Sequence, residues 1–127
     1  MASSESGLPV GQPVAATLND EEVKVLQVLA HLYATHNRLD EAVTLLETAE
    51  RHSPGNTEVM RALAAIHMLM KRHDAALELA DATLALQPTH DDRVALMLLR
   101  AQALWGLDRP LEARRAMAAY IEERQVP

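Results

Sequence analysis

The sequence has 127 residues, of which 49% are hydrophobic and only 2% aromatic, and it contains no cysteine. This length suits one domain, and a core of Ala, Leu, Val and Met favours helices, because strands are enriched in β-branched and aromatic residues. The formal net charge of −6 argues against unaided nucleic-acid binding. The absence of cysteine excludes disulfides and thiolate metal sites. The composition therefore predicts an all-α domain.

The first 19 residues are rich in Ser, Gly, Pro and Ala. We expect them to form a disordered N-terminal tail, with a tethered recognition segment as the alternative. They lack the basic region and the apolar run of a signal peptide. No stretch of the chain approaches the ~20 apolar residues that cross a bilayer. We therefore expect a cytoplasmic protein that does not insert into membranes.

Helix signals begin at the end of this tail and predict six helices, at about 20–36, 40–52, 57–71, 74–87, 91–105 and 109–124. Asn19 is followed three residues later by Glu22, which is the arrangement of a capping box. Asn37 is suited to the left-handed conformation between two helices. Pro54 and Pro88 restrict the residues before them and end the second and fourth helices.

The remaining boundaries have their own signals. Asn56 and Thr89 have side-chain oxygens suited to capping the third and fifth helices. Gly106 is expected to end the fifth helix, and Asp108 and Pro110 to open the sixth.

Similar residues recur along the chain at one fixed interval. Pro54 and Pro88 lie 34 residues apart, and the same interval separates five further pairs: Ala42 and Ala76, Leu45 and Leu79, Leu29 and Leu63, Ala30 and Ala64, and Leu32 and Ile66. Amphipathic helices alone repeat every ~3.6 residues and do not produce this interval. A 34-residue period with two helices per unit is the signature of the tetratricopeptide repeat.

The residues at the pattern positions make this resemblance specific. In the first unit, the positions of the pattern W-x2-L-G-x2-Y are occupied by Leu26, Leu29, Ala30 and Tyr33, and those of the second helix by Ala42, Leu46, Ala49 and Pro54. The resemblance covers about residues 20–124. It implies one domain over 20–127, with three tandem units (about 20–56, 57–90 and 91–124) in a short right-handed α-solenoid. The third unit departs from the pattern, because Arg100 replaces an apolar residue and the closing Pro is missing.

Small residues explain the pattern physically. Alanines on the first helices and on the second helices of the units allow the paired helices to approach closely: Ala30, Ala64 and Ala101, and Ala42, Ala76 and Ala113. We expect these positions to be buried.

The sequence offers no pattern typical of an enzyme or a metal site. None of the six histidines forms an i, i+4 pair with another, and no HExxH pattern exists: His31, His36, His52, His67, His73 and His90. Ser53 precedes Pro54 at a turn, and the remaining serines lie in the tail without a candidate base beside them. There is no Gly-rich phosphate loop. We therefore predict no catalytic residues, no metal and no cofactor.

In a solenoid of this kind the first helices line the concave face. We expect a partner protein to bind there, along a groove formed by Gln27, His31, Arg61, Met68, Leu69, Leu98, Gln102 and Trp105. The alternative for Met68 and Leu69 is burial between units. The cationic clamp that related repeat proteins use for a chaperone's terminal carboxylate has no counterpart here. An apolar groove suits an amphipathic helix or a hydrophobic segment instead.

A second binding surface is expected at the carboxyl end. The sequence stops soon after the sixth helix, so Met117, Tyr120 and Ile121 are expected to lack a covering helix. A homodimer or a partner chain would cover them.

The stretch LLRAQALWGLDRPLEARRAMAAYIEE, residues 98–123, resembles the small tetratricopeptide chaperones of bacterial type III secretion, particularly the SctY (YscY) family. This resemblance implies a cytoplasmic chaperone that binds a small secreted partner, SctX (YscX), and delivers it to the export apparatus. The alternative is a general scaffold or adaptor that joins other proteins.

Overall fold

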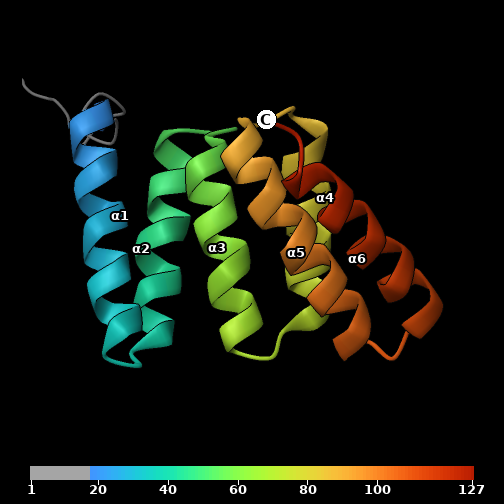
Figure 1. Cartoon of the computed structure of the whole chain (residues 1–127). Coiled ribbons are helices and arrows are strands. Elements are labelled where there is room, and N and C mark those ends of the chain that lie inside the picture. Colours follow the sequence, from blue (N-terminus) through green and yellow to red (C-terminus); the bar gives the residue numbers. More distant parts are fainter. Residues whose placement is uncertain (1–17) are drawn as a thin grey trace, which may run out of the picture.

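The computed structural model describes residues 18–127, and residues 1–17, where most of the predicted tail falls, lie outside the described part. It contains six helices and, among these residues, no strand (Figure 1). Their bounds are α1 (Asp20–Thr35), α2 (Leu39–His52), α3 (Thr57–Leu69), α4 (His73–Ala85), α5 (His90–Gly106) and α6 (Pro110–Arg124). Every boundary falls within two residues of its prediction, and the all-α solenoid is confirmed.

Consecutive helices pack as antiparallel pairs, and the pairs stack side by side (Figure 1). The first helices of the pairs, α1, α3 and α5, follow one another across the near face of Figure 1, with α4 behind them. Each of these first helices also contacts the next one directly, α1 against α3 and α3 against α5. The concave face predicted from the repeat therefore lies on α1, α3 and α5.

Alanines lie at the helix contacts, as predicted. All six of the predicted close-packing positions are buried, with exposed fractions of 5% or less: Ala30, Ala42, Ala64, Ala76, Ala101 and Ala113. Larger residues complete two clusters. The first lies among α1, α2 and α3 and includes Leu46 and Val59, and the second lies between α5 and α6 around Leu104. Because α4 contributes Leu79 to the first and Leu77 to the second, it joins the two halves of the core.

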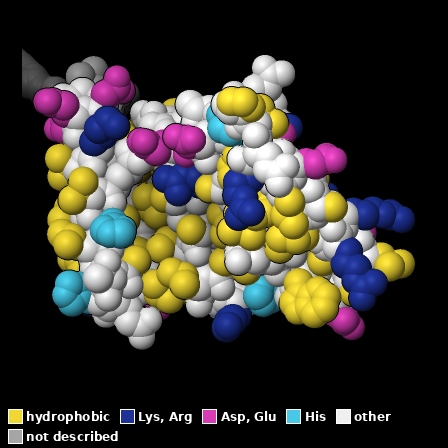
Figure 2. All heavy atoms as spheres, viewed as in Figure 1, with side chains coloured by type: hydrophobic (Ala, Val, Ile, Leu, Met, Phe, Trp, Pro, Cys, Tyr) yellow, Lys and Arg dark blue, Asp and Glu magenta, His cyan; other side chains and the backbone are white. Residues whose placement is uncertain are grey.

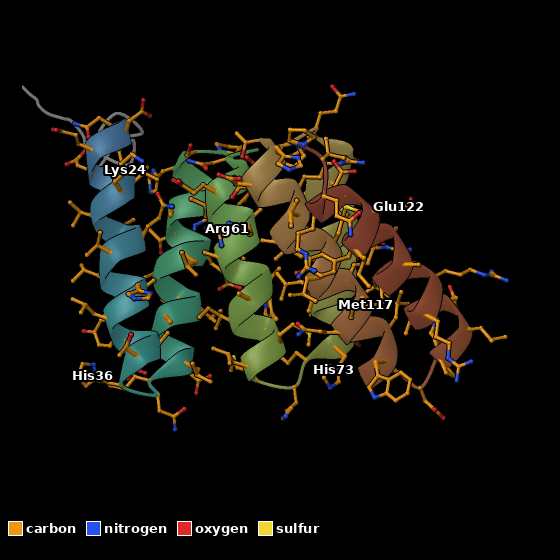
Figure 3. All side chains as sticks on the ribbon, viewed as in Figure 1. Lys24, His36, Arg61, His73, Met117 and Glu122 are labelled. Carbon is orange, nitrogen blue, oxygen red and sulfur yellow. The ribbon has the colours of Figure 1, made fainter. Side chains whose placement is uncertain are left out.

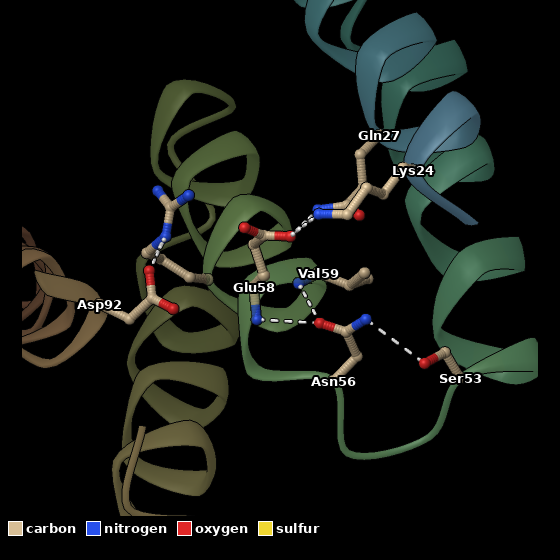
Figure 4. Close-up of polar contacts among 8 residues, drawn as sticks. Lys24, Gln27, Ser53, Asn56, Glu58, Val59 and Asp92 are labelled. Atoms are coloured by element: carbon tan, nitrogen blue, oxygen red, sulfur yellow. Dashed lines mark hydrogen bonds and ion pairs between the residues drawn. The ribbon is translucent and has the colours of Figure 1, made fainter. Parts of the chain in front are cut away.

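The predicted side-chain caps are present at the N-termini of all three first helices, α1, α3 and α5. The side chain of Asn19 accepts from the N–H of Glu22 at 2.8 Å, and the Asn19 N–H donates to the Glu22 carboxylate at 3.0 Å. Asn56 accepts from two backbone N–H groups, at 3.1 and 3.2 Å (Figure 4). Thr89 accepts from the N–H of Asp92 at 3.3 Å. Each bond satisfies a donor that a helix N-terminus would leave free.

The start of α6 differs from the prediction. Pro110 is its first residue, as expected, but Arg109 and not Asp108 is the N-cap, and no side chain caps this helix. Asp108 instead has a φ of 58° and takes part in the turn that ends α5.

This turn is repeated in all three units. After each first helix, one residue adopts a positive φ, and the N–H of the arginine that follows it donates to a carbonyl five residues back. The positive-φ residues are Asn37, Lys71 and Asp108, and the arginine bonds are Arg38 to Tyr33 (2.8 Å), Arg72 to His67 (2.9 Å) and Arg109 to Leu104 (3.0 Å). The pattern is that of a Schellman motif, in which the left-handed residue is most often Gly or Asn. Only Asn37 was predicted.

A substitution at Lys71 tests this geometry. Its φ of 62° strains a residue that has a Cβ, so Lys71→Gly should stabilise the fold by about 1 kcal/mol. Lys24→Gly places the same change inside α1, where glycine destabilises a helix by about 1 kcal/mol. Urea denaturation of both variants checks the opposite signs. A loss of stability in Lys71→Gly would contradict the assigned turn.

The N-terminus of α4 packs closely on the C-terminus of α5 (His73 is labelled in Figure 3). A Cβ built at Gly106 would lie 2.6 Å from three ring atoms of His73. Gly106 therefore leaves room for the His73 ring, and the contact connects the second unit to the third.

A double-mutant cycle tests this contact. Gly106→Ala adds helix propensity worth about 1 kcal/mol, but the clash with His73 should outweigh it and lower the free energy of unfolding, since overpacking costs about 1–3 kcal/mol. In a His73→Ala background the same change should stabilise the protein. Thermal denaturation of the four proteins measures the coupling. Equal effects of Gly106→Ala in both backgrounds would show that the two residues do not interact.

Candidate functional site: the groove between α1 and α3

A groove of about 650 Å³ opens between α1 and α3 on the concave face. Its walls carry small side chains, Ala30 and Ala34 on α1 and Ala62 and Ala65 on α3, and its floor is Leu46 of α2. Because alanines fill little of the space between two neighbouring helices, a hollow remains above Leu46. Figure 2 shows hydrophobic side chains over the middle of this face.

Charged and amide side chains border the groove at the N-terminal ends of α1 and α3. The Glu58 carboxylate accepts from Gln27 Nε2 at 3.1 Å and lies 3.5 Å from Lys24 Nζ (Figure 4). Arg61 Nε lies 2.8 Å from Asp92 Oδ1 in an ion pair that joins α3 to α5. This polar rim therefore connects all three first helices.

The rim is charged but locally neutralised. The hydrogen bond from Gln27, together with the charge of Lys24, holds the pKa of Glu58 below its ordinary value, so the carboxylate stays ionised near neutral pH. Lys24 faces Glu58 and Arg61 faces Asp92, so each cation has an anion beside it. The rim does not present a free pair of cations of the kind that would clamp a terminal carboxylate.

The opposite end of the groove combines an exposed aliphatic residue of α3 with polar residues of α1. Leu69, the last residue of α3, lines the groove and is 61% exposed. His31 and Thr35 line the α1 side of the groove, and the Thr35 hydroxyl donates to the backbone carbonyl of His31 at 2.8 Å. The groove thus runs from a charged rim to an end where Leu69 is the large exposed aliphatic residue.

The structure brings together four of the eight predicted groove residues. Gln27, His31, Arg61 and Leu69 line the groove between α1 and α3. Because Leu69 is mostly exposed, its alternative assignment to the interior is wrong, whereas Met68 is half-buried and does not line the groove.

The other three predicted residues lie on α5, outside this groove. Leu98 is half-buried, Gln102 is exposed and Trp105 is 65% exposed. They form a second exposed region on the concave side, which we call the α5 patch. That either region contacts a partner stays a prediction.

Sequence reasoning missed several residues that shape the groove. Ala34 and Ala62 of its walls, Leu46 of its floor and Val28 at its edge were not among the predicted site residues. The spacing of Ala30 and Ala34 places two small residues on one face of α1. That spacing was a usable signal, whereas the exposure of Val28 depends on the neighbouring helices.

The carboxyl end is more completely covered than predicted. Met117 packs against the second core cluster, so its own chain covers it. Tyr120 is half-buried, and the guanidinium of Arg124 lies 5.5 Å from the centre of its ring. Only Ile121 of the three is exposed, at 43%. The expected uncovered apolar face is therefore reduced to one large residue of the predicted set.

The histidines do not gather into a metal site. Among residues 18–127, no group of three or more His, Cys, Asp or Glu side chains is placed to hold a metal ion. His67 is half-buried; burial lowers its pKa, and the charge of Arg72 adds to this effect, while Glu47 opposes it. His67 is thus a neutral, packed histidine near neutral pH. No helix of the described residues is long and apolar enough to span a membrane.

Comparison with protein families identifies the repeat. Residues 33–98, slightly more than half of the chain, match the family model of the tetratricopeptide repeat. No curated protein matches the chain. Tetratricopeptide repeats are generally non-catalytic modules for protein–protein interaction. The paired helices are those expected of this repeat, and the match covers more than half of the chain. The chain therefore belongs to the tetratricopeptide repeat family.

Proposed function

We propose that this protein binds an apolar segment of a partner protein in the groove between α1 and α3. The observation that carries the proposal is the alanine-walled hollow above Leu46, which ends at the exposed Leu69. A groove of about 650 Å³ is large enough to receive several aliphatic side chains. Burial of such side chains would provide the affinity, since each contributes roughly 1.5–3 kcal/mol when fully buried.

The electrostatics of the rim favour this kind of ligand over a peptide held by its terminal carboxylate. Lys24 and Arg61 already face Glu58 and Asp92, so a carboxylate ligand would have to displace one of these anions. An amphipathic helix could place its apolar side on the alanines and its polar side toward the rim.

We further propose that the partner is a small secreted protein and that the protein acts as its cytoplasmic chaperone in type III secretion. The support is the resemblance of residues 98–123 to the SctY (YscY) family, whose partner is SctX (YscX). A chaperone of this kind would shield an apolar segment of its partner until export, and an apolar groove is suited to that task.

A general scaffold or adaptor is the second candidate function. It is favoured by the α5 patch, where Trp105 is 65% exposed outside the groove. Exposed tryptophans are common interface anchors. A scaffold would use this patch together with the groove to join two proteins.

The role of the groove is tested by Leu69→Glu. A carboxylate at this position would have to be desolvated on binding an apolar segment, so we expect the affinity for the captured partner to fall at least about tenfold. Leu86→Glu is the matched control, because Leu86 is 49% exposed at the end of α4 and does not line the groove. Affinity capture with the full-length tagged protein, followed by calorimetric titration of the captured partner, measures the effect.

Equal losses in Leu69→Glu and Leu86→Glu, or no loss in either, would refute binding in the groove. Both side chains are largely exposed, so circular dichroism should show unchanged helix content in both variants.

The same captured partner separates the two candidate functions. A dedicated chaperone should form a stoichiometric complex with one small protein. At a free partner concentration of 100 times Kd, that complex should stabilise the fold by about 2.7 kcal/mol. A scaffold should bind two proteins at once. Trp105→Ala combined with Ala95→Glu, at the half-buried residue three positions before Leu98 on α5, should release one of them while the other stays bound. Retention of a single small partner by that double variant would favour the chaperone.

A further inference from the structure

The outward face of α1 exposes a continuous stripe of large aliphatic side chains. Val25, Val28, Leu29 and Leu32 are 56%, 60%, 39% and 49% exposed. Their spacing of three and four residues places them on one side of the helix. In Figure 2 hydrophobic side chains run down the edge of the molecule over α1, at the left of the view. We call these four residues the α1 stripe.

The repeat itself shows what these positions do when they are covered. One unit later, 34 residues on, the positions of Val25, Leu29 and Leu32 are occupied by Val59, Leu63 and Ile66. Those residues are 0%, 7% and 7% exposed, because they belong to the core cluster that α3 forms with α1 and α2. The α1 stripe therefore has the composition of a contact between units, yet it faces outward.

Helix α6, at the other end of the solenoid, has a more polar exposed face than α1. Large aliphatic residues are also exposed on α6, Leu111 and Ile121, but Arg114, Arg115 and Glu122 are exposed on the same helix. A terminal unit of a repeat protein needs a polar outer face to stay soluble. The exposed face of α6 is largely polar, as this requirement asks, whereas the α1 stripe is aliphatic.

We propose that the α1 stripe is the contact surface of a homodimer in which two copies of α1 pack antiparallel across a two-fold axis. Such an axis requires a surface that is complementary to itself. With the axis between Val28 and Leu29, each Val28 meets the partner's Leu29, and each Val25 meets the partner's Leu32. A head-to-tail contact between α1 and α6 would instead set this stripe against arginines and would form a ring or an open filament, not a dimer with a two-fold axis. This dimer does not depend on the proposed role of the groove.

Charges at the two ends of the stripe fit the same register. Glu21 lies one turn before Val25 in the acidic first turn of α1, and His36 follows Leu32 by one turn. His36 is labelled at the lower end of α1 in Figure 3, and its Nδ1 donates to the Leu32 carbonyl at 2.8 Å, so its Nε2 can donate to a further acceptor only in the imidazolium form. In the antiparallel dimer, Glu21 of each copy meets the partner's His36. The carboxylate near one helix end thus faces an imidazole near the other, and the two form an ion pair when His36 is protonated.

The size of the contact sets its strength. One helix against one helix lies at the low end of protein interfaces, below about 1,200 Å² of total buried surface. We therefore expect a reversible dimer with Kd on the order of micromolar. Analytical ultracentrifugation of the full chain from about 1 µM to about 500 µM should show a mass rising from 14.0 kDa toward twice that value and no further.

Val25→Glu should raise the Kd of the dimer at least about tenfold, because the two-fold axis places the new charge in the interface twice. Leu111→Glu is the matched control on α6, since Leu111 is 66% exposed, and it should leave the Kd unchanged. Glu21→Lys and His36→Glu should each weaken the dimer about twofold to fivefold. Together in one chain they should restore it, since the introduced ammonium of each copy then faces the introduced carboxylate of the other.

Several outcomes would overturn the proposal. A protein that stays monomeric over the whole range, or one that forms species larger than a dimer, excludes the two-fold contact. Loss of the dimer in Ile121→Glu but not in Val25→Glu would place the contact on α6. Residues 1–17 are the alternative occupant of the α1 stripe. If the double variant Leu8→Asp with Val14→Asp dimerises while the unmodified protein is a monomer, then this segment, and not a second copy, binds the stripe.

Discussion

The close contact between paired helices at alanine is the constraint on which the rest of this structure depends. Ala42 and Ala76 are fully buried, and Ala30 and Ala64 face them from the first helices with at most 2% exposure. A larger side chain at any of these positions would push the helices of a pair apart. Since each pair also packs on the next, the displacement would pass along the solenoid. The repeat is conspicuous in the sequence because this requirement recurs once per unit.

The same choice of small residues creates the groove. Alanines that face a partner helix allow close packing, and alanines that face the space between α1 and α3 leave that space open above Leu46. The ion pair of Arg61 with Asp92 and the contacts of Glu58 with α1 hold the three first helices at fixed positions around it. Helix packing and the groove thus both depend on alanine, and Ala30 takes part in both.

Much of the fold was predictable because its signals are local. The caps at Asn19, Asn56 and Thr89, and Pro54 and Pro88 after the second helices, set the boundaries within two residues. The turn at Lys71 was not predictable, since lysine has no preference for a positive φ. The surrounding helices impose that conformation.

The exposed surfaces were predicted less completely, because exposure depends on neighbouring helices and not on the residue itself. Leu63 and Leu29 occupy equivalent repeat positions, yet they are 7% and 39% exposed, since Leu63 packs with residues of α1 and α2, whereas among residues 18–127 no other unit packs in the same way against Leu29. Met117 was expected at an uncovered surface, but it is half-buried against the second core cluster. Leu69 is the converse case, an aliphatic residue at a helix end that no other element covers. The periodicity of the sequence identified the apolar faces of the helices, but it did not show which of these faces stay exposed to solvent.

The central claim, that the partner is bound between α1 and α3, is tested most directly by site-specific photocrosslinking in cells. A benzophenone amino acid would replace His31 in the groove in one strain and Glu47, exposed on α2 and outside the groove, in another. We predict a partner adduct from position 31 and none from position 47. An adduct from position 47 alone would show that the partner binds a surface other than the groove, and it would contradict this account.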